Sequence, residues 1–314
     1  MAPLIPRMHL WEIDDQSCLP LLLPAANYPP YYTTILNRFR DIHLPLLSSL
    51  VRQSWPNRPL DHPPPGPQEA PSEYAADRLV QELGADVSSY TYIDFCAGGG
   101  GPTPSIEKAV NDQLRARGAP CVDFVLTDLY PNVGAWTRAT DGKPHISYEA
   151  ASVDASDVPK HLFERAGAGG KKVMRLFNLA FHHFDDPLAT KILKNTVETS
   201  DGFAIFELQG RDLTGLFGPM AFGLGGVLLA PFYALLWRSP IVFFFSSFIP
   251  IIPFVLMFDG WISALRTRTP DEVEALLRSC GADTSDWEVR SGSVCTHWPV
   301  GYMHWIICRP VKKK

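Results

Sequence analysis

One stretch of the chain decides the fold: Tyr92-Ile93-Asp94-Phe95-Cys96-Ala97-Gly98-Gly99-Gly100-Gly101-Pro102, followed about thirty residues later by Val125-Leu126-Thr127-Asp128. The apolar residues 90–95 predict a strand that stops at glycines, and residues 105–117 predict a helix with one apolar face. Glycines allow the backbone to approach a ligand closely. The order of strand, glycine turn, helix and acid-terminated strand predicts a nucleotide-binding crossover unit, in which Asp128 accepts hydrogen bonds from ribose hydroxyls.

The same stretch does not fit the dinucleotide pattern G-x-G-x-x-G, because Thr103 stands where the third glycine would fall. Asp94 lies just before the turn, where it would attract a charged amino group and repel a pyrophosphate. S-adenosylmethionine (SAM) carries an amino acid end and no phosphate. We therefore favour SAM over a nicotinamide or flavin nucleotide; the remaining alternative is a purely structural glycine turn.

Composition excludes several classes of protein. With 314 residues, the chain can form one large α/β domain with extensions. The net charge of −5, with no basic stripe outside residues 312–314, argues against a nucleic-acid surface. Six scattered cysteines without a C-x-x-C pair indicate reduced thiols in an intracellular protein and no structural zinc. The first residues lack the apolar run of a signal peptide, so that secretion is not indicated.

Proline divides the chain into two parts. The proline-rich residues 55–71 predict an exposed loop between an N-terminal extension, residues 1–72, and a nucleotide-binding domain, residues 73–314. The extension has a helix-like pattern over 37–51. In the domain, the patterns predict helices over 73–83, 186–198 and 270–279, strands over 146–150, 173–178 and 203–208, and a terminal hairpin of 287–291 with 302–308. This alternation predicts a doubly wound, Rossmann-like α/β sheet that is mostly parallel, with an antiparallel strand added at its edge by the hairpin.

From residue 73 to 310 the order of elements is similar to the class I SAM-dependent methyltransferases. Ile93 to Gly100 resembles their first motif, D-x-G-x-G-x-G, although Cys96 replaces the first glycine. Asp128 occupies the second acidic position, and Ser152-Val153-Asp154-Ala155 resembles the third motif, whose acid approaches the adenine amino group. The resemblance implies SAM as the cofactor. The residues that it assigns to cofactor binding are Asp94, Cys96, Gly98, Gly100, Asp128, Leu129, Asp154 and Asn178.

A narrower resemblance, to a poorly characterised bacterial and fungal branch of these enzymes, runs through the whole chain. It rests on five segments, and no substrate can be carried over from it. The segments are residues 11–16 (WEIDDQ), 127–132 (TDLYPN), 177–184 (FNLAFHHF), 249–253 (IPIIP) and 259–263 (DGWIS).

Two adjacent histidines, His182 and His183, follow the strand predicted over 173–178, at the sheet edge where open α/β sheets bind ligands. A histidine there could accept a proton from a nucleophile, because its pKa lies near neutrality. Adjacent side chains point in different directions, so at most one should face the substrate. Alternatively, one packs on the cofactor and the other caps the helix that begins near Asp186. The spacing His-His-x-Asp does not suggest a metal site.

Glu207 closes an apolar strand, where burial would raise its pKa and suit it to act as a base. A salt bridge from Glu207 to Arg211 or Arg266 is the structural alternative. Methyl transfer from a sulfonium depends largely on positioning, so a strong base is not obligatory. We assign three further residues to the substrate pocket: Phe181, Asp259 and Trp261.

Residues 215–258 form an apolar insert whose only formal charge is Arg238. It divides into two uncharged runs, 215–237 and 239–258, each about long enough to cross a bilayer. We expect a helical hairpin with Arg238 at its tip, attached to a membrane by embedding or by lying in the interface, because neither run has a polar face. The alternative is an apolar lid over the active site, and both interpretations imply a hydrophobic substrate.

The sequence thus predicts an intracellular, membrane-associated enzyme that transfers a methyl group from SAM to a hydrophobic small molecule or lipid. Two other classes of function remain open. One is a cyclisation or rearrangement in secondary metabolism on the same fold, and the other is a membrane-tethered binding protein without catalysis. Formation of S-adenosylhomocysteine separates the first function from both alternatives.

Overall fold

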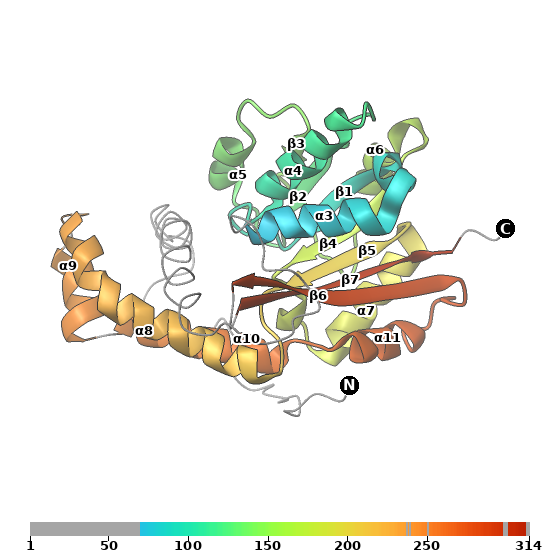
Figure 1. Ribbon diagram of the computed structural model, residues 1–314. Coiled ribbons are helices and arrows are strands. Elements are labelled where there is room, and N and C mark those ends of the chain that lie inside the picture. Colours follow the sequence, from blue (N-terminus) through green and yellow to red (C-terminus); the bar gives the residue numbers. More distant parts are fainter. Residues whose placement is uncertain (1–69, 237, 239, 250, 298–300, 312–314) are drawn as a thin grey trace.

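The computed structural model describes residues 70–236, 238, 240–249, 251–297 and 301–311 (Figure 1). Most of the expected N-terminal extension, including the helix-like stretch 37–51, lies outside these residues. The methyltransferase-like domain expected from residue 73 onward lies almost entirely inside them.

The described chain contains a seven-stranded sheet in the order β3-β2-β1-β4-β5-β7-β6. The first five strands in the sequence are parallel to one another, and β7 is antiparallel to both β5 and β6. This confirms a Rossmann-like, mostly parallel sheet with a terminal hairpin. The strands are β1 (Tyr90–Phe95), β2 (Phe124–Thr127), β3 (Ile146–Tyr148), β4 (Lys172–Asn178), β5 (Phe203–Glu207), β6 (Trp287–His297) and β7 (Gly301–Pro310).

One detail of the expected topology is wrong. The antiparallel strand does not form the sheet edge; β7 lies between β5 and β6, and β6 is the edge strand. The residues of the two strands explain this order. β7 carries the buried Trp305, Ile306 and Ile307, which suit a position covered on both faces. β6 carries Glu288 and Arg290, which form an ion pair with each other, and charged side chains are tolerated on an edge strand.

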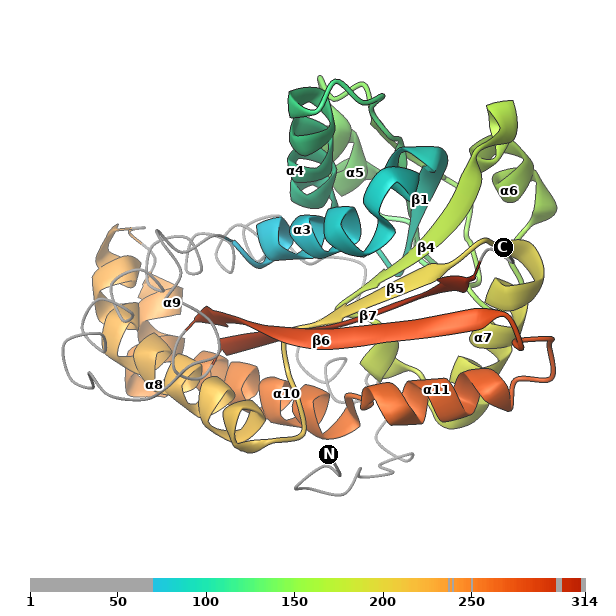
Figure 2. The ribbon, with the colours of Figure 1, turned by 45° about the vertical axis from the view of Figure 1, so that its right-hand side comes forward.

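Helices cover both faces of the sheet (Figures 1 and 2). One face packs against α3 (Pro71–Leu83), α4 (Thr103–Ala116) and α5 (Val133–Thr140). The other packs against α6 (Lys160–Ala166), α7 (Asp186–Thr199) and α11 (Pro270–Arg278). The sequence patterns did not predict α5 and α6, because segments of eight and seven residues are too short to establish a helical period. Short 3₁₀ segments lie at Gly84–Ser89 (η2), Ala168–Gly170 (η3) and Phe181–His183 (η4).

The insert forms the expected helical hairpin, which we call the apolar arm. It consists of α8 (Leu213–Leu236), α9 (Pro240–Phe243), a π-helical turn η5 (Phe244–Phe248) and α10 (Ile251–Arg266). α8 and α10 pack side by side, and the arm extends away from the sheet (Figures 1 and 2). Among the described residues, no helix combines the length and apolarity that crossing a membrane would require.

Candidate functional site

The glycine turn after β1 has the backbone geometry that its motif predicts. The φ angles of Cys96, Gly98 and Gly100 are 63°, 52° and 106°, all in the region that favours glycine. Cys96 therefore adopts the conformation of the glycine that it replaces, at a cost on the order of 1–2 kcal/mol. Leu179, with φ 56°, is a second such residue at this site. Strained backbone gathers at functional sites, which makes this turn the first candidate.

Two side chains hold the turn in place. The backbone N–H of Gly98 donates to Oδ2 of Asp128 (2.8 Å), and the Nε1–H of Trp136 donates to the carbonyl of Gly98 (2.8 Å). The backbone N–H of Tyr130 donates to the other oxygen of Asp128 (2.8 Å). Trp136 is fully buried on α5, and the sequence analysis did not identify it. The sequence signal that could have identified Trp136 is Asn132. Its side chain caps the N-terminus of α5, the short helix that carries the tryptophan.

Asp94 lies at the end of β1 and is only 1% exposed. The hydroxyl of Thr103 donates to its Oδ2 (2.5 Å), and the amide of Asn178 donates to its Oδ1 (3.1 Å). Burial raises the pKa of Asp94 to about 7, while these two hydrogen bonds act in the opposite direction. Thr103, which breaks the dinucleotide pattern, thus ties the start of α4 to β1.

The orientation of Asn178 follows from its donors. Its Nδ2 donates to Asp94 and to the Oγ1 of Thr103 (3.0 Å), which turns its carbonyl oxygen the other way. Oδ1 is buried and has no hydrogen-bond partner among the described residues. An acceptor of this kind costs free energy unless it is paired. Since Asn178 lines a cavity, its carbonyl is placed to accept a hydrogen bond from a ligand there.

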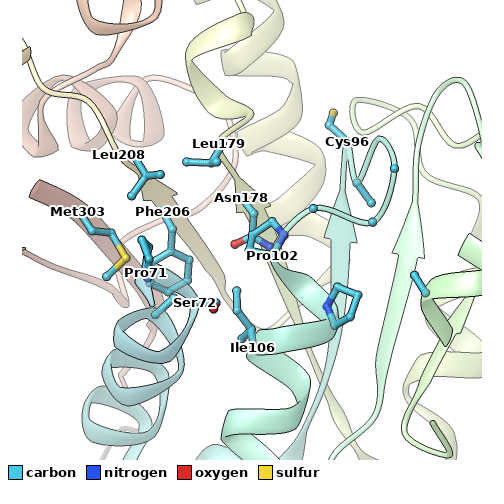
Figure 3. Close-up of a pocket in the computed structure, with 17 residues that line it drawn as sticks. Pro71, Ser72, Cys96, Pro102, Ile106, Asn178, Leu179, Phe206, Leu208 and Met303 are labelled. Carbon is cyan, nitrogen blue, oxygen red and sulfur yellow. The ribbon is translucent and has the colours of Figure 1, made fainter. Parts of the chain in front are cut away.

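The cavity has a volume of about 480 Å³ and lies at the carboxyl ends of β1, β4 and β5. Figure 3 shows Asn178 and Pro102 at its centre, Cys96 to one side, and an apolar group of Phe206, Leu208 and Met303 on the other. It thus has a polar wall made by the glycine turn and an apolar wall made by the sheet and α3. The remaining lining residues are Pro71, Ser72, Ala75, Ala97, Gly99, Gly100, Gly101, Pro104, Ile106, Ala139 and Leu179.

Acidic side chains converge on the glycine turn. Burial raises the pKa of the Cys96 thiol to about 12, and the charges of Asp128, Asp94 and Asp154 add to the effect, which places all three acids near Cys96. Asp154 is exposed, and its Oδ1 accepts hydrogen bonds from the backbone and the hydroxyl of Ser156 (both 2.8 Å). Leu129, beside Asp128, is 45% exposed. The residues assigned to the cofactor therefore lie around one turn.

His182 and Glu207 form a buried pair. The Nδ1 of His182 lies 2.8 Å from Oε2 of Glu207, and its backbone N–H donates to Oε1 (3.1 Å). Both side chains are 5% exposed. The alternative salt bridge to Arg211 or Arg266 is wrong: Arg211 pairs with Glu272, and Arg266 donates to the carbonyl of His183 (2.7 Å).

A third titratable residue, His304, lies next to this pair. His304 lies directly across from Glu207 on β7, and burial lowers its pKa, while Asp212 and Glu207 act in the opposite direction. The alternative in which a histidine caps the following helix is wrong, because the side chain of Asp185 caps α7 by accepting from the N–H of Leu188 (2.8 Å).

The residues assigned to the substrate pocket do not line the cavity. Phe181 is buried beneath the sheet, where its ring packs against Phe177 and Phe184. Trp261 donates from Nε1 to the carbonyl of Leu216 (2.8 Å) and so joins α10 to α8. Asp259 is exposed on α10. The sequence suggested these three residues because aromatic and acidic side chains suit a substrate pocket. Only the packing shows that Trp261 and Asp259 belong to the arm.

No family model and no curated protein matches the chain. Among solved structures, it is similar to human N-acetylserotonin methyltransferase in complex with SAM (14% identity, TM-score 0.38), over 76% of this chain and 55% of that chain, about half its length. It is also similar to magnesium protoporphyrin IX methyltransferase from Synechocystis PCC 6803 with bound SAH (11% identity, TM-score 0.42), over 89% and 100% of the two chains. A third is the 1,6-didemethyltoxoflavin-N1-methyltransferase of Burkholderia thailandensis (12% identity, TM-score 0.41), over 92% and 94%. At these identities and TM-scores, the similarity concerns the fold alone.

Proposed function

We propose that the chain transfers a methyl group from SAM to a hydrophobic small-molecule or lipid acceptor, at or near a membrane. The observation that carries this proposal is the division of one site into an acidic side and an apolar side. Asp128 and Asp154 act on Cys96 in the glycine turn, and Cys96 also lines the largely apolar cavity together with Asn178. A cationic cofactor and an apolar acceptor would meet at this turn.

The acidic side suits the nucleoside and amino acid parts of SAM. Each oxygen of Asp128 accepts one backbone N–H and retains a second acceptor site for a ribose hydroxyl. Asp154 would accept from the adenine amino group, and Leu129 would pack on the adenine ring. The carbonyl of Asn178 would accept from the ammonium group. Three carboxylates near one turn would repel a pyrophosphate, which disfavours a dinucleotide.

The apolar wall would hold the acceptor. Ile106, Phe206, Leu208 and Met303 offer an apolar surface without charge, and burial of apolar area is the main source of affinity for such a molecule. SAM, when bound, supplies an activated methyl group for an in-line displacement. The chain then has to align two molecules, and alignment alone can provide much of the rate.

His182 is our candidate for the proton acceptor. Glu207 accepts from both the backbone N–H and, in the neutral histidine, the Nδ1–H of His182. This tautomer leaves Nε2 without a proton. His182 does not line the cavity, so it would take the proton of the nucleophile through an intervening water. Glu207 is then a positioning residue for the imidazole of His182.

The decisive experiment is binding and turnover by the purified chain. We expect calorimetry to show binding of SAM, and S-adenosylhomocysteine to form when an apolar acceptor from host-cell extracts is supplied. A product that has gained no methyl group would select the cyclisation or rearrangement alternative instead. If SAM did not bind at all, the proposal would be refuted.

Asp94 adds a pH dependence to SAM binding. With its pKa raised to about 7, Asp94 is largely protonated near pH 6. A cation bound at Asn178 favours the carboxylate, so binding should lower this pKa and release a proton. Affinity should therefore rise between about pH 5 and pH 7 and level off above. Calorimetry near pH 6.5 in buffers of different ionisation enthalpy measures the release, which Asp94→Asn should abolish. Identical binding enthalpies in all buffers would contradict this role of Asp94.

A further inference from the structure

The apolar arm exposes large apolar side chains over most of its surface. Leu228 and Leu235 of α8 are 70% and 72% exposed, and Phe248 in the turn is 69% exposed. At about 100° per residue, the exposed Leu216, Leu228 and Leu236 spread over roughly 200° of the circumference of α8. The apolar stripe of a helix that packs on a soluble protein is narrower, at about 100°. The arm is therefore apolar on several sides at once.

The two helices of the arm meet at glycines. A Cβ atom placed on Gly223 would lie 3.0 Å from the Cβ of Met257, and one on Gly260 would lie 2.9 Å from the Cβ of Pro219. Glycine thus allows α8 and α10 to approach closely. Two helices that pair in water place large apolar side chains between them and polar ones outside. Small residues between helices, with large apolar ones outside, are typical of helices surrounded by lipid.

The root of the arm is fixed to the catalytic fold. Trp261 bonds to the carbonyl of Leu216, and Arg266 bonds to the carbonyl of His183. Gly215 packs so closely on the carbonyl of Gly210 that no side chain would fit there. Figure 2 shows the arm extending past the ends of β6 and β7, on the side of the sheet where the strands that line the cavity end. Whatever surrounds the arm is thereby held beside the cavity.

We propose that the apolar arm is embedded in the hydrocarbon region of a phospholipid bilayer, which it enters from one leaflet. This rests on the proposed location at or near a membrane and names the partner as the lipid itself. A second copy of the chain would cover one side of the arm and leave the rest exposed, whereas lipid covers all sides. Arg238 is exposed at the turn, so its long side chain reaches the lipid phosphates when the arm lies along the leaflet that it enters rather than upright in it.

Vesicle flotation tests the inference. The full chain, transferred from mild detergent to vesicles of phosphatidylcholine and phosphatidylglycerol, should float with them. The double variant Leu228→Glu/Leu235→Glu should reduce the floated fraction by about tenfold or more, since each glutamate would bring a charge into hydrocarbon. Leu188→Glu is the matched control: it places the same charge on an exposed leucine of α7 and should float like the unmodified chain. Melting followed by circular dichroism checks that all three fold.

Two outcomes would overturn the inference. One is a chain that stays monomeric without detergent and does not float. The other is a soluble dimer that the double variant converts to a monomer, which would make a second copy the occupant. Failure of the proposed function is separable from these results, because SAM binding is measured by calorimetry on the same preparations. A chain that floats without binding SAM keeps the arm in lipid and loses the methyltransferase.

Discussion

Asp128→Ala is expected to weaken SAM binding by about 1.5–3 kcal/mol, which is a roughly 10- to 150-fold rise in Kd. The reason is the loss of a charged acceptor for two ribose hydroxyls. The substitution also removes the acceptor for the backbone N–H groups of Gly98 and Tyr130, so the turn would loosen as well. Isothermal calorimetry at fixed pH and salt measures the change.

Two further variants separate these effects. Asp128→Asn keeps one oxygen acceptor for the turn but loses the charge, so it should fall between Asp128→Ala and the unmodified chain. Asp123→Ala removes an exposed acid at the opposite end of β2, where it pairs with His145, and should leave affinity unchanged. Unaltered SAM affinity in a folded Asp128→Ala variant would refute the ribose assignment.

His182→Ala and Glu207→Gln are expected to lower kcat by about 10²-fold or more, if His182 accepts the proton of the nucleophile. The first removes the acceptor itself, and the second disturbs the carboxylate that sets its tautomer. His183→Ala is the control, because its ring is not the partner of Glu207, and kcat should change little. Rates with the true acceptor, measured at saturating SAM, test this difference.

Stability must be followed in the same variants. Removing His182 leaves the buried carboxylate of Glu207 without its side-chain partner, which costs on the order of 1–3 kcal/mol or more. Kinetics are therefore compared well below the Tm of the weakest variant. If His182→Ala and Glu207→Gln both retained the unmodified rate, methyl transfer here would depend on proximity alone, and the role of His182 would be limited to joining the segment after β4 to the end of β5.

The strands were largely predictable because the patterns that define them are local. The glycines, the acids at strand ends and the apolar runs marked β1, β2, β4 and β5 closely. α5 was missed because it is short, and with it Trp136, whose bond to Gly98 holds the turn. The place of β7 inside the sheet was also missed, because hairpin strands look alike in sequence and only their packing against β5 decides which is covered.

The sequence by itself determined the nucleotide-binding unit and the apolar hairpin, since both depend on periodicity and on residue types near one another in the chain. Tertiary structure decided which side chains meet. Asn178 reaches Asp94 across 84 residues, and Glu207 reaches His182 rather than an arginine. Glycines that are scattered along α8 and α10 become one contact surface only when the helices pair. Contacts of this kind depend on where elements distant in sequence lie in space, which no local pattern encodes.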